Sequence, residues 1–521
     1  MMRKKRIPQK RQLPRKRQMS KRLDRARAFE KEKIQQYDPQ KRPAFHLTGL
    51  TGWINDPNGF SFFENCTHLF YQANPYARQP ELIHWGHAVT EDLVNWTYFP
   101  CALAPSEKYD LDGCFSGSAL TLPDGRHLLM YTGYRDGEEG KEYRQVQCIA
   151  AGDGCDYVKF EKNPVLSSED VPEGGSKADF RDPKIYEESG QYKALVANRA
   201  ADGTGAILVY ESEDGFSWRF GGTLLANHGR YGSMWECPDL FSLDGTDILL
   251  FSTQQSSGTD PEFHPGHGAV CMYGRYEKEN NRFAPEGAQT IDWGVDFYAP
   301  QTVLLPDGRR IMIAWMQNWE TCQFYREDLA FHGQMTIPRE ISFRNRQLIQ
   351  NPVRELENCR SERTAYEQVK VDGTRVLPGI GGRCIDLTVK IRPEEQADPA
   401  DPMKRFFIDL AAEKDVQTTL EFDPVLSQLS IDRTRSGFPH DIANRRSIPV
   451  RLADGAITLR ILLDRYSLEV FVNGGEQAAS FVMYGPEEAE EIRFRSIGRA
   501  VIDAEQYTIK GTVPDLRSGA E

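Results

Sequence analysis

Residues 122–132 read LPDGRHLLMYT, a turn followed directly by a short apolar strand. Pro, Asp and Gly favour a tight hairpin turn, and the apolar run after them predicts a β-strand. Residues 305–315, LPDGRRIMIAW, repeat the same arrangement. Three further strands of this kind occur at HLFYQ from 68, ALVAN from 194 and ILLFS from 248. The chain therefore contains a fivefold repeat.

A second repeat lies between the first four of these strands. TEDLVNW, AGDGCDY and SEDGFSW place Asp92, Asp153 and Asp214 at intervals of 61 residues, each four residues before an aromatic residue. A unit of about 60 residues with several short strands is typical of a propeller blade. We predict an all-β protein with a five-bladed β-propeller over residues 43–350. A single sandwich or an up-and-down barrel would not need a unit this long.

The repeat stops near residue 350, and short alternating strands of a different pattern follow. They include CIDLTVKI, TTLEFD, ITLRILLD and LEVFVNG, and Asn473-Gly474 is a good two-residue hairpin turn. This pattern predicts a C-terminal β-sandwich over residues 355–515, packed on the propeller.

The net charge of −12 is unevenly distributed. Residues 1–33 carry 15 Lys and Arg against 3 Asp and Glu, so the rest of the chain is strongly acidic. An acidic body disfavours nucleic acid as the main partner, and only the basic segment could bind a polyanion. We expect residues 1–42 to be a basic, disordered tail and lead-in without a catalytic role. Translation starting at Met19 would remove most of it.

The ten cysteines form no CxxC pair and no compact framework, which favours reduced thiols in a cytoplasmic protein. No stretch approaches the roughly 20 apolar residues that a membrane helix needs. The sequence gives no indication of the oligomeric state.

One residue of each apolar strand serves as a reference: Leu69, Leu129, Leu195, Leu249 and Ile311. Counting back thirteen residues from each leads to one polar or aromatic position per blade. In a propeller the strand before each hairpin lies nearest the axis, so these positions should converge at one end of the central channel. Three of the five are carboxyl groups, and their crowding pushes at least one pKa upward. The positions are Asp56 in WINDPNG, Ser116 in FSGSA, Asp182 in FRDPK, Glu236 in WECPD and Tyr298 in DFYAPQ.

Two kinds of chemistry would use such a group of acids. A neutral acid beside an ionised carboxylate is the pair that glycoside cleavage needs. A hard metal ion is the alternative, because it prefers oxygen ligands, but Arg181 beside Asp182 would partly substitute for it. HWGH at 84–87 and HPGH at 264–267 are better explained as structural histidines than as metal ligands. We expect neither a metal nor a cofactor.

At these residues the sequence resembles glycoside hydrolase family 32, the family of invertases, sucrose-6-phosphate hydrolases and fructanases. WINDPNG, FSGSA, FRDPK, WECPD, DFYAPQ and TIPRE follow one another in the family's order, and LSIDR with LEVFVNGG is similar to its C-terminal module. The resemblance spans residues 43 to 500 approximately. It implies the same architecture of propeller and sandwich.

The resemblance also implies roles for individual residues. Asp56 would be the nucleophile on the fructosyl C2, Glu236 the general acid and then base, and Asp182 the transition-state stabiliser. The configuration would be retained through a covalent fructosyl-enzyme, which predicts Asp56 and Glu236 carboxyl groups about 5 to 5.5 Å apart. The implied substrate-binding residues are Trp53, Asn55, Gln72, Phe115, Ser116, Arg181, Tyr298 and Trp315.

The implied function is a retaining β-fructofuranosidase that acts on a small sugar: sucrose, sucrose 6-phosphate or a short fructan. YDLDGCFSGSA at 109–119 is most similar to bacterial enzymes for sucrose or its 6-phosphate. Pro80 stands where many family members have Trp, and the loss of this pocket wall would alter the grip on the substrate. The alternative function is a non-catalytic sugar-binding propeller, although such a module has no reason to keep all three acids.

Overall fold

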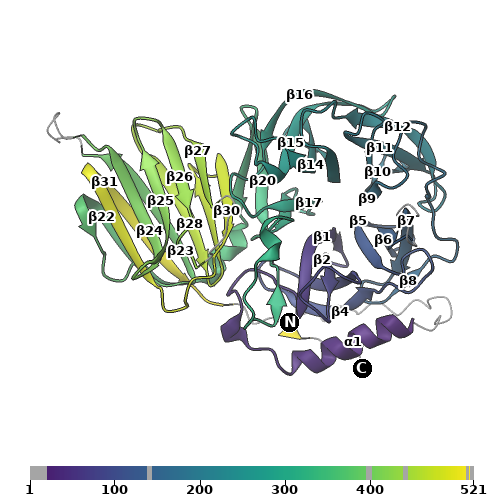
Figure 1. Cartoon of the computed structure of the whole chain (residues 1–521), viewed down its shortest axis with the longest axis horizontal. Coiled ribbons are helices and arrows are strands. Elements are labelled where there is room, and N and C mark those ends of the chain that lie inside the picture. Colours follow the sequence, from purple (N-terminus) through teal and green to yellow (C-terminus); the bar gives the residue numbers. More distant parts are fainter. Residues whose placement is uncertain (1–19, 138–143, 395–401, 438–443, 512–514, 517–521) are drawn as a thin grey trace, which may run out of the picture.

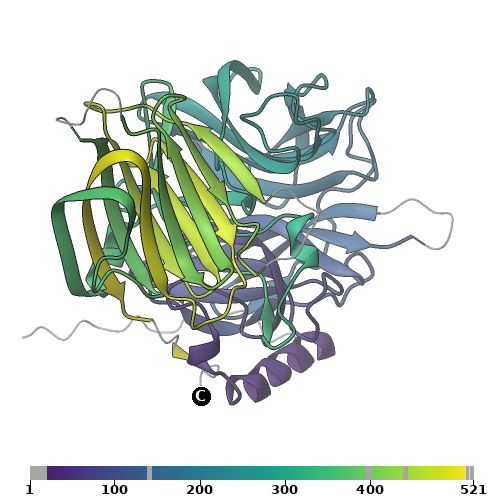
Figure 2. The same ribbon diagram turned by 60° about the vertical axis from the view of Figure 1, so that its left-hand side comes forward.

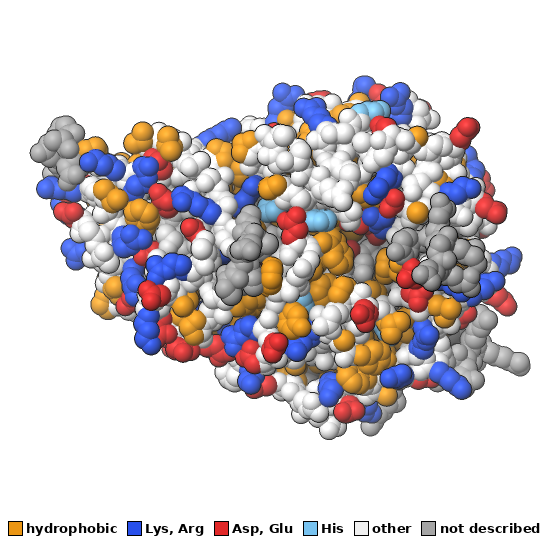
Figure 3. All heavy atoms as spheres, in the orientation of Figure 1, with side chains coloured by type: hydrophobic (Ala, Val, Ile, Leu, Met, Phe, Trp, Pro, Cys, Tyr) orange, Lys and Arg blue, Asp and Glu red, His pale blue; other side chains and the backbone are white. Residues whose placement is uncertain are grey.

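The protein consists of a propeller with a sandwich beside it (Figure 1). α1 is the one α-helix in the described part of the chain, and no helix there is long and apolar enough to cross a membrane. On the face drawn in Figure 3, Lys and Arg side chains alternate with Asp and Glu and form no single basic stretch. The structure, a computed structural model, describes residues 20–137, 144–394, 402–437, 444–511 and 515–516.

Each blade is an antiparallel sheet whose strands follow one another along the chain, except that β19 and β32 add short parallel pairings to the two edges of blade 1. Blade 1 comprises β1 (Gly52–Phe63), β2 (Cys66–Asn74), β3 (His84–Thr90) and β4 (Thr97–Leu103), with β19 (Phe331–His332) and β32 (Asp515–Leu516) at its edges. Blade 2 comprises β5 (Gly113–Thr121), β6 (His127–Arg135), β7 (Arg144–Gly152) and β8 (Tyr157–Lys159). Blade 3 comprises β9 (Phe180–Glu188), β10 (Gln191–Arg199), β11 (Gly205–Ser212) and β12 (Arg219–Ala226). Blade 4 comprises β13 (Met234–Leu243), β14 (Thr246–Ser256), β15 (Gly266–Glu277) and β16 (Arg282–Thr290). Blade 5 comprises β17 (Tyr298–Leu304), β18 (Arg310–Trp315), β20 (Arg339–Arg344) and β21 (Gln347–Pro352).

The first strand of every blade lies nearest the axis. β1, β5, β9, β13 and β17 contact their neighbours in a closed ring, and the blades radiate from it in Figure 1. A closed ring leaves few free strand edges. The predicted five-bladed propeller is confirmed.

The 61-residue repeat has a structural cause. Asp92, Asp153 and Asp214 each begin the turn between the third and fourth strands of their blade. One carboxylate oxygen of each accepts hydrogen bonds from the backbone N–H groups two and three residues later. A short acidic side chain is favoured here because it replaces a backbone acceptor in the turn.

The expectation of disorder was wrong for residues 21–34, which form α1 (Lys21–Ile34) along the outer side of blade 1 (Figure 1). Leu23 and Ala26 are buried beneath this otherwise charged helix. The Glu30 carboxylate accepts a hydrogen bond from the backbone N–H of Cys101 in β4. Helix α1 therefore covers the edge of an outer strand, which sequence polarity alone did not indicate. Residues 1–19 lie outside the described residues, so their predicted disorder and polyanion binding stay predictions.

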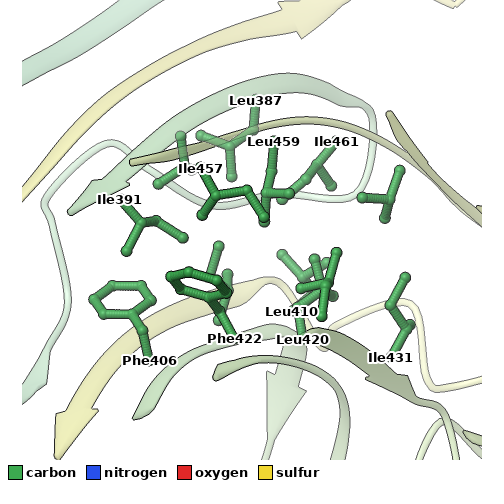
Figure 4. Close-up of a cluster of buried hydrophobic side chains, with 14 of the residues drawn as sticks. Leu387, Ile391, Phe406, Leu410, Leu420, Phe422, Ile431, Ile457, Leu459 and Ile461 are labelled. Carbon is green, nitrogen blue, oxygen red and sulfur yellow. The ribbon is translucent and has the colours of Figure 1, made fainter. Parts of the chain in front are cut away.

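The C-terminal strands form the predicted sandwich (Figure 2). β31 belongs to both layers, because its first half pairs with β24 and its second half with β23. Apolar side chains from β23 and β28 face those from β24, β25 and β26 across the core (Figure 4). The strands are β22 (Arg360–Arg375), β23 (Ile385–Pro393), β24 (Arg405–Glu413), β25 (Val416–Asp423), β26 (Gln428–Asp432), β27 (Arg445–Pro449), β28 (Ile457–Asp464), β29 (Ser467–Val472), β30 (Gln477–Val482) and β31 (Glu491–Ile509).

A buried network of charges joins the start of the propeller, blade 5 and the sandwich. The His46 ring bonds Asp464 at 2.8 Å and Glu469 at 2.9 Å, and Arg339 pairs with Glu469 and with Asp292. Burial alone would lower the pKa of His46, but the hydrogen bonds and charges of the two carboxylates outweigh it and raise that pKa to about 9. Charges this deeply buried are tolerated only when each has its partners.

A His46→Gln variant tests this network. The pKa of His46 is raised from 6.5 to about 9 on folding, so its stabilising contribution is complete below pH 6.5 and is lost as the pH rises through 9. We expect the variant to unfold at a lower urea concentration than the parent near pH 6, by a difference equivalent to about 2 to 3 kcal/mol. The difference should shrink above pH 7. His228→Gln, at an exposed site, is the control, and a difference that does not change with pH would contradict the assignment.

Candidate active site

The inner strand of every blade has a register shift at the same level of the channel. β9, β13 and β17 are interrupted after Arg181, Glu236 and Tyr298, where two residues lie opposite one on the neighbouring strand. β1 and β5 are interrupted around Asp56 and Ser116. A bulge of this kind re-aims side chains. The repeated bulge therefore turns one short segment of each blade toward the axis.

The pairing of the first and second strands corrects which residues of the different blades are equivalent, as obtained above by counting thirteen residues. Arg181, Glu236 and Tyr298 occupy the same place before the bulge, and the residue after each has a positive φ, at +61° for Asp182 and +49° for Cys237. The structural counterpart of Asp182 is thus Cys237, not Glu236. The count was one residue out because the apolar runs used as references do not begin at the same position of their strands.

Asp56 lies in β1 beside the bulge of that strand and is 5% exposed. Its carboxylate accepts hydrogen bonds from Ser116 Oγ at 2.6 Å, Asn55 Nδ2 at 3.1 Å and Gln72 Nε2 at 3.2 Å. Burial raises the pKa of Asp56 to about 6, the Ser116 hydrogen bond opposes this rise and the charge of Glu236 adds to it. Asp56 is therefore ionised and oriented at neutral pH.

Asp182 lies across the thiol of Cys237 from Asp56. The Cys237 sulfur is 3.6 Å from Asp182 Oδ2 and 3.7 Å from Asp56 Oδ2, and the Cys237 N–H donates to Asp182 Oδ2 at 3.2 Å. Burial, followed by the negative charge of Glu236, raises the pKa of Asp182 to about 8. Crowding of like charges therefore disfavours joint ionisation of Asp182 and its carboxylate neighbours.

Glu236 is held by donors from two other blades. Arg181 Nε donates to Oε1 at 2.8 Å, and the Tyr298 hydroxyl donates to Oε2 at 2.6 Å. Glu236 and Arg181 are each 8% exposed. Both carboxylate oxygens thus have a fixed partner, which sets the direction in which a proton can be given or taken.

The structure brings together all the residues predicted for substrate binding. Asn55, Gln72 and Ser116 bond Asp56, while Arg181 and Tyr298 bond Glu236. The remaining three belong to one apolar cluster that also contains Cys237 and Tyr298; they are Trp53, Phe115 and Trp315. The Trp53 indole also donates to Asn55 Oδ1 at 2.7 Å.

Trp319 is an aromatic residue that the sequence analysis missed. Its ring lies 6.3 Å from the Trp53 ring at an interplanar angle of 21°, and 5.2 Å from that of Trp315. Trp53 and Trp315 are fully buried, whereas Trp319 is only partly buried. Pro80 is exposed. The aromatic wall beside the acids therefore continues outward through Trp319. In the sequence, a second Trp four residues after Trp315 was the signal that could have indicated this.

Two glutamines of β7 were also missed. Gln145 Oε1 accepts the backbone N–H of Phe180, and Gln147 Nε2 donates to the Phe180 carbonyl. These side chains tie blade 2 to the strand that carries Arg181 and Asp182. Gln145 and Gln147 are two residues apart, so they lie on one face of β7. The sequence alone did not identify them as site residues, because polar residues in an outer strand are usually exposed.

The HWGH histidines lie outside this cluster of acids, whereas His267 of HPGH borders it, with its ring 5.9 Å from the Tyr298 ring and within range of the Glu236 charge. The ring nitrogen of His84 bonds the Leu82 carbonyl, and His87 stacks on Phe70 and bonds His68. Within the ranges that the structure describes, no three His, Cys, Asp or Glu side chains are grouped so as to hold a metal ion.

An Asp182→Asn variant tests the electrostatic cost of the site. The unfolded chain loses the Asp182 proton near pH 3.8 but the fold keeps it to about pH 8, so ionisation of Asp182 costs stability increasingly over that interval. We expect the neutral variant to be more stable than the parent at pH 7, by about 1 to 2 kcal/mol, with a gain that grows between pH 4 and 8. Thermal unfolding at several pH values measures it. Asp153→Asn at an exposed turn should show no such trend, and an Asp182→Asn protein less stable than the parent at pH 7 would refute the analysis.

Comparisons with known proteins agree with this geometry. The model for the "Glycosyl hydrolases family 32 N-terminal domain" matches residues 46–352, and that for the "Glycosyl hydrolases family 32 C terminal" matches residues 355–510. A raffinose invertase from Escherichia coli is 34% identical over 460 residues, covering 86% of this chain and 91% of its own length. A sucrose-6-phosphate hydrolase from the same organism is 34% identical over 466 residues, with 88% and 93% covered.

The solved structure of a GH32 β-fructofuranosidase from Bombyx mori superposes with a TM-score of 0.80 at 28% identity, covering 94% of this chain and 99% of that one. Both domains of the family are therefore present in the expected order. The chain belongs to glycosyl hydrolases family 32 and is a glycoside hydrolase of the β-fructofuranosidase type.

Proposed function

We propose that the protein hydrolyses the β-fructosyl bond of sucrose, sucrose 6-phosphate or a short fructan, with retention of configuration. The observation that carries this proposal is the joint burial of Asp56, Asp182 and Glu236, which are between 5% and 8% exposed, on the inner strands of three blades, where each has its own hydrogen-bond donors. A mutant of the related Bombyx mori enzyme has been solved in complex with sucrose.

In the first step Asp56 attacks C2 of the fructosyl group. Ser116 and Asn55 hold the attacking carboxylate in place, and Glu236 gives its proton to the glycosidic oxygen as that bond breaks. A covalent fructosyl-enzyme forms and the other sugar leaves. Asp182, whose neighbour Cys237 lies between it and Asp56, bonds fructosyl hydroxyls as positive charge develops at C2.

In the second step Glu236 acts as a base. It takes a proton from a water molecule, which attacks C2 from the side that the leaving sugar has vacated, and Asp56 is released as a carboxylate. Arg181 and Tyr298 each donate to one oxygen of Glu236 and so hold the carboxylate in place for this step. Two inversions at C2 give net retention.

The leaving sugar would stack on the outer part of the aromatic wall. Trp319 is partly exposed and is supported by the buried rings of Trp53 and Trp315. An aromatic face of this kind suits the apolar side of a pyranose ring. It would take over the role that a Trp at position 80 has in many family members.

We also infer a cytoplasmic location. All ten cysteines are free thiols, which fits a reducing compartment. Fractionation of the producing cells, with fructose release assayed in each fraction, tests this inference.

An Asp56→Ala variant tests the nucleophile. The parent is incubated with sucrose, sucrose 6-phosphate, inulin and levan, and the released fructose is measured. We expect release from at least one substrate by the parent and a loss of at least about 10⁴-fold in the variant, because no covalent intermediate can form. Asp153→Ala, at a turn on the outside of blade 2, is the matched control. Release by neither protein would favour the alternative function, a non-catalytic sugar-binding propeller, and full activity of Asp56→Ala would remove the nucleophile assignment.

A Glu236→Gln variant tests the acid. We expect sucrose cleavage to fall by about 10² to 10⁴-fold. β-Fructofuranosyl fluoride, whose leaving group needs no proton, should still transfer its fructosyl group to Asp56, giving a burst of fluoride equal to the enzyme concentration. Equal losses on sucrose and on the fluoride would show that Glu236 is not the proton donor.

A further inference from the structure

Arg181 has a second carboxylate partner besides Glu236. Its Nε donates to Glu236 Oε1 at 2.8 Å, whereas Nη1 donates to Asp179 Oδ1 at 3.0 Å and to Gln145 Oε1 at 3.3 Å. The guanidinium is therefore fixed at two points that lie on its opposite sides. Neither Asp179 nor Gln145 contacts Asp56, Asp182 or Glu236 in any recorded hydrogen bond of the described residues.

Asp179 is itself rigidly held. Its backbone N–H donates to Ser176 Oγ at 3.0 Å, and the same hydroxyl is 3.2 Å from Asp179 Oδ2. The Asn198 side chain donates to its backbone carbonyl. Arg199, which is partly exposed, forms an ion pair with Asp179 Oδ2 at 3.3 Å. A row of alternating charges thus runs from the protein surface through Asp179 and Arg181 to Glu236.

We propose that Asp179 is a positioning residue that acts on Glu236 through Arg181. It anchors Nη1 of Arg181 so that Nε keeps its hydrogen bond to Glu236, and it offsets part of the guanidinium charge so that Glu236 can still hold the proton that it donates in the first step. The inference rests on the proposed role of Glu236 as general acid. Gln145 shares the anchoring but contributes no charge.

Asp179 is needed because the two steps of the reaction make opposite demands on Glu236, which must hold a proton in the first step and be ionised in the second. A cation 2.8 Å from a buried carboxylate favours the ionised form, which helps the base and hinders the acid. Arg181 stays charged, because Glu236, Asp182 and Asp179 outweigh the effect of burial and raise its pKa. A carboxylate on the far side of Arg181 weakens its field at Glu236 without touching the substrate.

Other groups also act on Glu236 and must be kept constant in the test. They come from four neighbouring strands and from its own strand. They are Asp56 from β1, Arg181 and Asp182 from β9, Cys237 from β13, His267 from β15 and Tyr298 from β17.

Asp179→Asn removes the charge and keeps the shape. We expect the pH above which sucrose cleavage declines to move downward by about one unit, because Glu236 loses its proton more easily beside an uncompensated Arg181. Formation of the fructosyl-enzyme from β-fructofuranosyl fluoride should show no such shift. Asp179→Glu should restore most of the parent profile. Asp214→Asn, a turn residue of blade 3 remote from Arg181, should leave it unchanged.

A second measurement does not depend on turnover. The carboxyl carbon of Glu236 is followed by ¹³C NMR against pH in the parent and in Asp179→Asn, with Glu236→Gln identifying the signal. A lower pKa of Glu236 in Asp179→Asn supports the inference, and equal values in the two proteins overturn it. A parent that releases no fructose would refute the proposed function, whereas the NMR titration would still decide whether Asp179 acts on Glu236.

Discussion

Burial of three neighbouring carboxyl groups on the inner strands of the propeller is the constraint around which the active site is organised. Asp56 and Asp182 have raised pKa values chiefly because they are buried, and Glu236 adds its charge to both. The protein tolerates this because each acid has fixed donors, with Arg181 as the nearest cation. Such an arrangement adds nothing to stability, but it disfavours joint ionisation of the three carboxyl groups, which suits a site that needs both an acid and a carboxylate.

The backbone makes this crowding possible. Each inner strand is interrupted by a bulge at the level of the pocket, and Asp182 and Cys237 adopt positive φ there. L-residues rarely occupy this region, so some conformational strain is concentrated at the site. The closed ring of inner strands holds these segments in place from both sides. Side chains that are 181 residues apart, Asp56 and Cys237, therefore meet within 3.7 Å.

The sandwich and the helix stabilise the propeller from outside. His46, Glu469 and Arg339 join the start of the propeller, the sandwich and blade 5 through buried ion pairs. Sequence polarity predicted the strands of both domains but not this network, because a charged residue in an alternating strand is normally assigned to the exposed face. The same rule led to the wrong prediction of disorder for the residues of α1, because only two residues of this highly charged helix are buried.

The sequence alone determined the number of blades and the sandwich, because hairpin turns and strand alternation are local properties that recur along the chain, and it supplied the three acids as a prediction. The tertiary structure decided what surrounds those acids. Asp179, Gln145 and Trp319 reach the site through contacts between blades or through a loop, and no local pattern encodes such contacts. It also decided the register, since a bulge shifts a strand by one residue and only the paired strand reveals it.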